Sequence, residues 1–299
     1  MTKPPDAPRV PLIDGLGAIA DRYDAVLCDI WGVVHDGRRA FAPASDALVA
    51  FRRRGGAVVL ISNAPRPNPP IHEQVLRLGV SPDAFDAIVT SGDVAIGLVA
   101  ERIAEPFHHI GPPRDLALVE AAAARAGARA QMVGLDEASY VLCTGLFDDT
   151  VETPDDYAER LRAMAARRLP LICANPDLVV HRGADLIYCA GALAQAYETL
   201  GGEAIYAGKP HAPIYDAALK AAGAARQAPL ARSRVLAIGD AMRTDVAGAS
   251  RQGIDALFVA AGIHRDAFQD SDAEDARELE DLFRRENLWP VAVVRALAP

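Results

Sequence analysis

Short apolar runs alternate with longer segments of helical periodicity along most of the chain. The runs have the length of strands, and they contain few polar positions. Strands are therefore expected at residues 25–28, 57–61, 87–90, 140–144, 171–174, 205–206, 235–238 and 256–259. Helices are expected at residues 44–54, 72–78, 95–103, 115–126, 154–167, 193–200, 213–222 and 244–252. This alternation predicts an α/β fold with a mostly parallel sheet covered by helices on both faces.

Chemically distinctive residues follow several of these strands directly. In open α/β sheets, ligands bind outside the carboxyl ends of the strands, so polar residues at those ends are candidates for a shared site. The candidates, in chain order, are Asp29, Ser62 with Asn63, Lys209, and Asp240 with Asp245. Each signal alone is modest, and the ordered set is far more specific than any of its members.

Asp29 is the candidate nucleophile, because a carboxylate at a strand end can attack phosphorus and form a covalent aspartyl-phosphate. The competing interpretation is an Asp that only caps or turns the chain. Gly32, three residues later, allows the sharp turn that a bound anion would require. The hydroxyl of Ser62 and the backbone N–H groups at Ser62 and Asn63 can hold a phosphoryl oxygen, although Ser and Asn are also ordinary turn residues.

Lys209 and the acids Asp240 and Asp245 supply the charges that such chemistry needs. Lys209 precedes a proline that makes its position rigid, and a fixed ammonium can neutralise a phosphoryl group. The competing interpretation of Lys209 is an exposed surface lysine. Asp240 and Asp245 leave a buried strand together, and a hard divalent cation such as Mg2+ is their natural partner. Asp245 is equally compatible with a helix N-terminal carboxylate.

The spacing of these residues predicts the domain organisation. One helix and one strand separate Asp29 from Ser62, whereas the interval from Ser62 to Lys209 is far longer than a crossover and has its own strand–helix alternation. We therefore expect a catalytic core at residues 1–84 and 201–299, with an inserted domain at residues 85–200. A domain inserted between two halves of a site is expected to act as a cap that selects the substrate.

The charge and cysteine content of the chain indicate which binding partners and which cellular compartment are expected. The 299 residues carry a net charge of −9 and no basic block, which argues against nucleic acid and against an anionic membrane surface. The acidic stretch at residues 270–281 is interpreted as a solvated helix face. The four cysteines have no metal-ligand spacing and are expected to be reduced core residues. Residues 1–6 lack an apolar signal region, and no run has membrane-spanning length, so a cytoplasmic location is expected.

The motifs also resemble a known family. The segments that carry the resemblance are Asp29-Ile30-Trp31-Gly32-Val33, Ser62-Asn63, Gly208-Lys209-Pro210 and Gly239-Asp240 with Thr244-Asp245. They are similar to the four motifs of the haloacid dehalogenase (HAD) superfamily. The cap position resembles subfamily IIA, which has a C2-type cap and includes NagD-like and 4-nitrophenylphosphatase-like enzymes. Further similarity lies in Phe41-Ala42-Pro43-Ala44, Asn175-Pro176-Asp177 and Ala190-Gly191-Ala192.

The resemblance covers nearly the whole chain and implies a Rossmann-like, doubly wound parallel core with an inserted α/β C2-type cap. It implies hydrolysis of a small phosphorylated metabolite, such as a sugar, aryl or acyl phosphate, through an aspartyl-phosphate on Asp29. It also implies Mg2+ held by Asp29, the backbone oxygen of Trp31, Asp240 and Asp245. A homodimer through the cap is left open.

The sequence departs from the phosphatase pattern at Trp31, where the family has a second Asp that protonates the leaving group. An indole cannot transfer a proton near neutral pH, and losing a general acid costs about 10²–10⁴ in rate. Three interpretations follow: a phosphatase whose leaving group needs little protonation or whose acid is recruited elsewhere, a dehalogenase-like hydrolase of a non-phosphate bond, or a weakly catalytic protein that binds a phosphometabolite.

Four further residues complete the candidates. His35 and Asp36 lie on the same loop as Trp31 and are candidate acids, although Asp36 is more simply a turn residue. His181 and Arg182 follow Asn175-Pro176-Asp177 and are candidate substrate contacts from the cap, with an exposed surface pair as the competing interpretation. His108 and His109 show no metal spacing and are expected to be structural.

Overall fold

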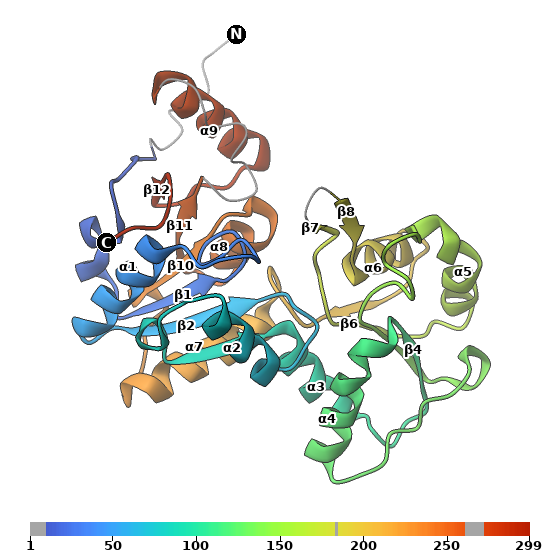
Figure 1. The fold of residues 1–299 in the computed structure, drawn as a ribbon. Coiled ribbons are helices and arrows are strands. Elements are labelled where there is room, and N and C mark those ends of the chain that lie inside the picture. The colour runs from blue at the N-terminus through green and yellow to red at the C-terminus, as the bar shows by residue number, and fades with distance from the viewer. Residues whose placement is uncertain (1–9, 183–184, 261–271) are drawn as a thin grey trace. The chain divides into compact units, whose positions relative to one another are not determined.

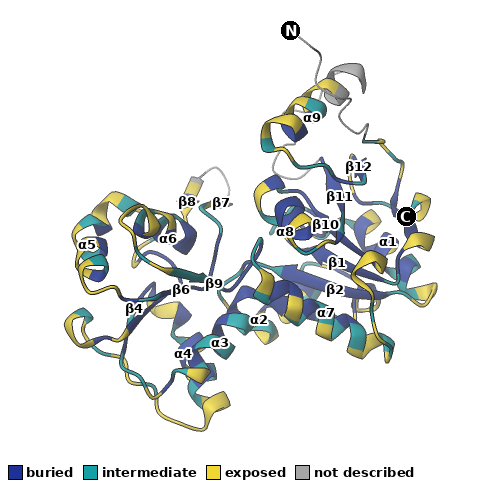
Figure 2. Cartoon of the chain, turned by 180° about the vertical axis from the view of Figure 1, so that it is seen from behind, coloured by how far each residue is buried: buried dark blue, intermediate teal, exposed yellow. Residues whose placement is uncertain are grey.

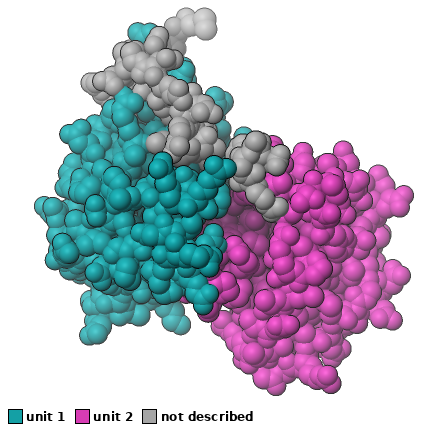
Figure 3. All heavy atoms as spheres, in the orientation of Figure 1, with its two compact units in different colours: residues 1–61, 72–88, 215–299 teal, residues 62–71, 89–214 magenta. Residues whose placement is uncertain are grey.

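The computed structural model describes residues 10–182, 185–260 and 272–299 of the chain. The chain divides into two compact units, which Figure 3 shows in different colours. Unit 1 comprises residues 1–61, 72–88 and 215–299, and unit 2 comprises residues 62–71 and 89–214. The functional cap boundaries expected from the sequence, residues 85 and 200, remain a prediction.

Unit 1 is built on a six-stranded sheet in the order β12-β11-β10-β1-β2-β3 (Figure 1). The paired strands β1 with β10, β1 with β2, β10 with β11, and β11 with β12 are all parallel. Its strands are β1 (Ala25–Asp29), β2 (Ala57–Ser62), β3 (Ala87–Thr90), β10 (Val235–Gly239), β11 (Asp255–Val259) and β12 (Ala292–Val294). Chain order runs outward in both directions from the β1–β10 pair, which is the doubly wound arrangement with its switch point between these two strands.

The helices associated with this sheet are α1 (Ala42–Arg53), α2 (Asn68–Arg77), α7 (Ala212–Arg226), α8 (Ala247–Arg251) and α9 (Asp272–Glu286). A π-helical turn, Met242–Val246, precedes α8. Every residue of β1 and β10 is buried, so these strands appear dark blue in Figure 2. Burial on both faces explains why their sequences are unbroken apolar runs.

Unit 2 has a four-stranded parallel sheet of its own, in the order β4-β5-β6-β9. Its strands are β4 (Phe107–Ile110), β5 (Tyr140–Cys143), β6 (Leu171–Cys173) and β9 (Ala204–Tyr206). Its helices are α3 (Ser91–Glu101), α4 (Leu116–Ala126), α5 (Ala158–Ala166) and α6 (Ala190–Thr199). An antiparallel hairpin, β7 (Val179–Arg182) with β8 (Asp185–Tyr188), lies outside this sheet.

Alternate residues of β5 pack into two different hydrophobic clusters, one on each face of the unit 2 sheet. Val141 and Cys143 pack with residues of α5 and α6, whereas Tyr140 and Leu142 pack with residues of α3 and α4. This period of two is the pleat of a strand, and it shows that helices cover both faces of the unit 2 sheet. The α/β class, the parallel core sheet and the separate parallel cap sheet expected from the sequence are therefore confirmed.

Short 3-10 turns connect several of these elements, at Leu16–Ala18, Ala20–Arg22, Pro82–Ala84, Pro113–Asp115, Leu135–Glu137, Pro154–Tyr157 and Arg232–Arg234. All four cysteines are buried thiols outside any disulfide, and burial raises the pKa of the Cys143 thiol to about 12. Among the described residues, no helix is both long enough and apolar enough to cross a membrane.

Candidate functional site

Asp29 is the last residue of β1, and the sheet holds it on both sides. The register pairs Cys28 with Ile238 of β10 and Asp29 with Ile61 of β2. The side chain therefore leaves the sheet at its carboxyl edge and at the switch point, where α/β proteins bind ligands. Asp29 is 8% exposed, so its carboxylate lies in a largely dehydrated position.

Asp240 and Asp245 reach the same edge from the neighbouring strand. Asp240 directly follows β10, and Asp245 lies in the π-helical turn, where its Oδ2 accepts a hydrogen bond of 3.2 Å from the Ala241 backbone N–H. A Cβ at Gly239 would collide with the side chain of Asp245, so this strand end must be glycine for the carboxylate to fold back over it. Asp240 is 1% exposed and Asp245 is 3% exposed.

One oxygen from each of these three carboxylates lies within 4.8 Å of the other two. Three buried carboxylates at such separations repel one another unless a cation compensates their charge. Oxygen ligands and this density of negative charge suit a hard divalent ion such as Mg2+. The three residues therefore fit a bound metal, which supports the metal-ligand prediction for Asp29, Asp240 and Asp245.

Gly32 forms the turn that faces this cluster. Its φ of +78° is in the left-handed region, and a Cβ here would collide with Oδ2 of Asp240. The Ile30 carbonyl accepts hydrogen bonds from the N–H groups of Val34 at 3.0 Å and His35 at 3.3 Å, which closes the turn. Glycine is required here both for its backbone conformation and for the close approach of the carboxylate.

Trp31 and His35 form a pair on this loop. Trp31 is 46% exposed, and its ring meets that of His35 edge to face, with centroids 5.4 Å apart. His35 is buried, and its Nδ1 accepts a hydrogen bond of 3.1 Å from the Gly37 N–H. Burial lowers the pKa of His35, so the imidazolium is less available near neutral pH than the sequence led us to assume. Asp36 accepts hydrogen bonds from the Arg38 and Arg39 N–H groups, as its interpretation as a turn residue predicts.

Unit 2 brings together Ser62, Asn63 and Lys209, which the sequence proposed as phosphate contacts. The Ser62 Oγ accepts a hydrogen bond of 3.2 Å from the Ala64 N–H, which leaves the hydroxyl hydrogen to donate elsewhere. The Asn63 side chain binds the backbone of Lys209 reciprocally, accepting from its N–H at 2.7 Å and donating to its carbonyl at 3.1 Å. The Lys209 side chain is buried, so its interpretation as an exposed lysine is wrong.

Asp177 is a contact that the sequence did not predict. Its Oδ1 accepts a second hydrogen bond from Asn63 Nδ2, at 2.8 Å. The Asp177 backbone N–H donates to Oδ1 of Asn175 at 3.1 Å, so the segment that follows β6 is fixed next to Asn63. Because these bonds occupy the Asn63 amide, what this residue can offer a phosphate is its backbone. In the sequence, Asn175-Pro176-Asp177 shows only a similarity to the family and predicts no partner for Asp177.

Three further histidines lie in unit 2: His181, beside Arg182, and the neighbours His108 and His109. His181 and Arg182 lie in β7, paired through the backbone with Leu186 and Asp185, and their side chains lie outside the described residues. His108 accepts a hydrogen bond of 2.9 Å from Arg160 and donates one of 3.1 Å to the Val133 carbonyl. His109 contacts the Thr144 hydroxyl at 2.9 Å, and burial lowers its pKa to about 4. These contacts support structural roles for His108 and His109.

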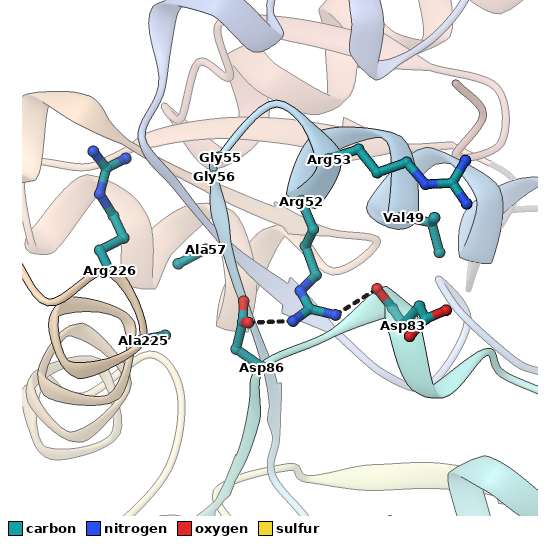
Figure 4. A pocket seen from close by; sticks show the side chains of 10 residues that line it. All are labelled: Val49, Arg52, Arg53, Gly55, Gly56, Ala57, Asp83, Asp86, Ala225 and Arg226. Atoms are coloured by element: carbon teal, nitrogen blue, oxygen red, sulfur yellow. Dashed lines mark hydrogen bonds and ion pairs between the residues drawn. The ribbon is translucent and has the colours of Figure 1, made fainter.

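Unit 1 also contains two hollows that are alternative candidates for a ligand site. One, of about 390 Å³, lies beside Gly32 and is lined mainly by apolar residues, including Phe41 and Leu297. The other, of about 400 Å³, lies where β2 begins, at the opposite edge of the sheet from Asp29 (Figure 4). Its Arg52 donates a hydrogen bond to the Asp83 carbonyl and forms an ion pair with Asp86, and the residues that line it include none of Asp29, Asp240 and Asp245.

Known proteins match the chain over both units. The family of haloacid dehalogenase-like hydrolases matches residues 26–125, and the HAD-hydrolase-like family matches residues 206–283. A solved hydrolase of the haloacid dehalogenase-like family from Brucella suis 1330 is 44% identical, with a TM-score of 0.81. That match covers 96% of this chain and 100% of the Brucella protein.

More distant relatives extend the comparison. D-glycerol 3-phosphate phosphatase from Mycobacterium tuberculosis is 27% identical over 264 residues, which cover 83% of this chain but only 65% of the relative's length. NagD from E. coli K-12 is 22% identical with a TM-score of 0.63, over 92% of this chain and 96% of NagD, and it shares the fold. The chain therefore belongs to the haloacid dehalogenase-like hydrolases.

Proposed function

We propose that this protein is a Mg2+-dependent phosphatase that hydrolyses a small phosphorylated metabolite through an aspartyl-phosphate on Asp29. The observation that carries the proposal is the cluster of Asp29, Asp240 and Asp245, three buried carboxylates at the switch point of the sheet. Relatives support it, because one is a D-glycerol 3-phosphate phosphatase and because a glycerol phosphate phosphatase from Mycobacterium tuberculosis was solved in complex with calcium. An ion held by these carboxylates would neutralise charge on the phosphoryl group and orient it.

In the proposed reaction, an oxygen of the Asp29 carboxylate attacks phosphorus, and the bond from phosphorus to the leaving oxygen breaks. Water then attacks the phosphorus of the acyl-phosphate, which releases inorganic phosphate and restores the carboxylate. The family resemblance assigns Lys209 the role of a fixed cation toward the phosphoryl group, and it assigns Ser62 and the Asn63 backbone the role of donors to its oxygens. The hydroxyl hydrogen of Ser62 that remains to donate agrees with this role.

The leaving group in this proposal departs with little help from a proton donor. Trp31 has no acidic proton to give, and His35 is a poor replacement because it is buried and its Nδ1 already accepts a hydrogen bond from the Gly37 N–H. The substrate is therefore expected to be an ester whose leaving oxygen is stable as an anion, such as an aryl, acyl or anomeric phosphate. This requirement separates the protein from phosphatases that cleave simple alkyl esters efficiently.

The proposal is tested with a panel of phosphomonoesters in Mg2+, run beside 2-haloacids in EDTA. We expect phosphate release that requires Mg2+ and that falls at least about 10³-fold in Asp29→Asn, because an amide is nearly isosteric but is not a nucleophile. Asp36→Asn is the matched control, since it makes the same chemical change on the same loop and preserves the turn acceptor. Halide release that persists in EDTA would support the dehalogenase-like alternative, and binding without turnover would support a phosphometabolite-binding protein.

A further inference from the structure

The exposed indole of Trp31 lies on the loop beside the carboxylate cluster. It lies two residues after Asp29 and one residue before Gly32, the turn that lies against Asp240. A tryptophan that is 46% exposed leaves much of a large apolar ring in water, at a cost of roughly 25 cal/mol per Å² of apolar surface. Single exposed apolar residues are common, but this one is on the loop that faces the carboxylate cluster, within the same unit.

The ring is held in place by its own loop. Trp31 and His35 form a backbone bridge, and the Gly32 N–H donates to the His35 carbonyl at 2.9 Å. The six-membered edge of the indole lies against Gly37, whose φ is +83° and where a Cβ would collide with Cη2 of the indole. The buried His35 ring supports the indole edge to face at 84°. A ring fixed in this way loses little conformational entropy when a ligand covers its open part.

Two properties of Trp31 favour the same kind of leaving group in a substrate. An aromatic surface favours a second aromatic ring, because offset stacking adds to the gain from burial. The absence of a proton donor favours a leaving oxygen of low basicity, and phenols, with pKa values of about 10 as in tyrosine, provide one. An aromatic leaving group satisfies both conditions, whereas an anomeric sugar oxygen satisfies only the second and a polyol satisfies neither.

We propose that Trp31 is a specificity-determining residue that stacks on the aromatic leaving group of an aryl phosphate. This inference rests on the proposed phosphatase function and narrows its substrate class. It assigns the side chain at the position of the missing acid a role in binding the leaving group. When the bond from phosphorus to the leaving oxygen breaks, the leaving group departs as a phenolate with the electron pair of that bond. Asp29 and Trp31 then act on opposite sides of the same bond, the carboxylate on phosphorus and the indole on the ring that departs.

The first experiment measures binding without turnover. The chain has two tryptophans, so Trp289→Phe, which retains an aromatic partner for Phe283, leaves Trp31 as the only indole fluorophore. With Mg2+ present, phenylphosphonate should quench this emission and bind about tenfold more tightly than methylphosphonate. Isothermal titration calorimetry, which needs no fluorophore, should show that this preference largely disappears in Trp31→Leu and largely returns in Trp31→Phe. Equal affinities for the two phosphonates, or no binding of phenylphosphonate, would overturn the proposal.

The second experiment separates stacking from leaving-group basicity. It compares kcat/KM for phenyl phosphate with that for trifluoroethyl phosphate, an alkyl ester whose leaving oxygen is also of low basicity. The aryl-to-alkyl ratio should fall about tenfold in Trp31→Leu, mainly through KM, and should be unchanged in Trp289→Phe. An unchanged ratio in Trp31→Leu, with Mg2+- and Asp29-dependent hydrolysis intact, sinks the stacking role and leaves the phosphatase proposal standing. If no phosphomonoester is turned over, the phosphatase proposal fails and the phosphonate measurements still decide the role of Trp31.

Discussion

At the carboxyl edge of the unit 1 sheet, the neighbouring carboxylates determine which residue type fits at two positions. Gly32 and Gly239 both lie where a methyl group would overlap a metal-ligand candidate, Asp240 in one case and Asp245 in the other. The two glycines therefore give the buried acids their room. The unusual backbone of Gly32 adds a second requirement, because non-glycine residues with positive φ are strained by about 1–3 kcal/mol.

Substituting Gly32 tests this relation between backbone and metal site. Gly32→Ala should lower the free energy of unfolding by about 1–3 kcal/mol and should also raise the Mg2+ concentration needed for half-maximal activity, because Asp240 must move. Gly55→Ala is the matched control, since Gly55 has a φ of +87° but nothing within 4 Å of an added Cβ. It should cost stability without altering the Mg2+ requirement. Equal Mg2+ requirements in the two variants would contradict the account.

At the scale of elements, Asn63 connects segments that are far apart in the sequence. Its amide ties the end of β2 to the backbone of Lys209 and to Asp177 after β6. The Lys209 N–H donates to a side chain and not to a strand, so a change at Asn63 leaves a buried donor unpaired. The position of Lys209 thus depends on a residue that sequence reasoning had assigned to the phosphate itself.

Asn63→Ala should lower the free energy of unfolding by about 1–3 kcal/mol, the cost of leaving buried polar groups without partners. Asn63→Asp should also destabilise, because it places a carboxylate beside Asp177. The double variant Asn63→Asp with Asp177→Asn restores a donor–acceptor pair and should recover part of that loss in urea unfolding. Additive losses in the double variant would show that the Asn63–Asp177 bond contributes nothing measurable.

A second element-scale prediction concerns acid stability and His109, one of the two histidines in β4. Burial, and to a lesser extent the charge of His108, lowers the pKa of His109 from 6.5 to about 4. Between these values the unfolded chain binds more protons than the folded chain, so the free energy of unfolding falls as the pH falls through that window, by up to about 3 kcal/mol. His109→Gln keeps a hydrogen-bonding group for Thr144 and should flatten this dependence, measured by urea unfolding from pH 7 to pH 4. An unchanged slope would mean that His109 is not responsible.

For the whole molecule, much of the fold was predictable because it rests on burial. The eight strands expected from apolar runs are all present, since strands covered on both faces have unbroken apolar sequences. The strands that were missed have weaker signals. His108 and His109 interrupt the apolar pattern of β4, β12 is only three residues long, and the β7–β8 hairpin lies outside both parallel sheets. Helix α2 begins at Asn68, before its expected start, because Pro69 and Pro70 fit the first turn.

Part of the candidate site was also predictable from the sequence, and part depends on tertiary contacts that the sequence does not reveal. Asp29, Asp240 and Asp245 were found from their positions at strand ends, and the structure brings their oxygens together because parallel strands end at one edge. The contact from Asn63 to Asp177 was not predictable, because it joins residues more than 100 positions apart with no periodic signal. The burial of His35, which lowers its pKa, is likewise a tertiary property that a Trp-Gly-Val-Val-His segment does not reveal.

The central claim is that Asp29 becomes phosphorylated during turnover, and chemical trapping tests it most directly. Borohydride reduces an acyl-phosphate to an alcohol, so reduction during hydrolysis of an aryl phosphate in Mg2+ should convert the side chain at position 29 to that of homoserine, detected by peptide mass spectrometry. The product should be absent without substrate, in EDTA, and in Asp29→Asn. Steady phosphate release with no reduction product at position 29, or release by Asp29→Asn at the wild-type rate, would contradict the account.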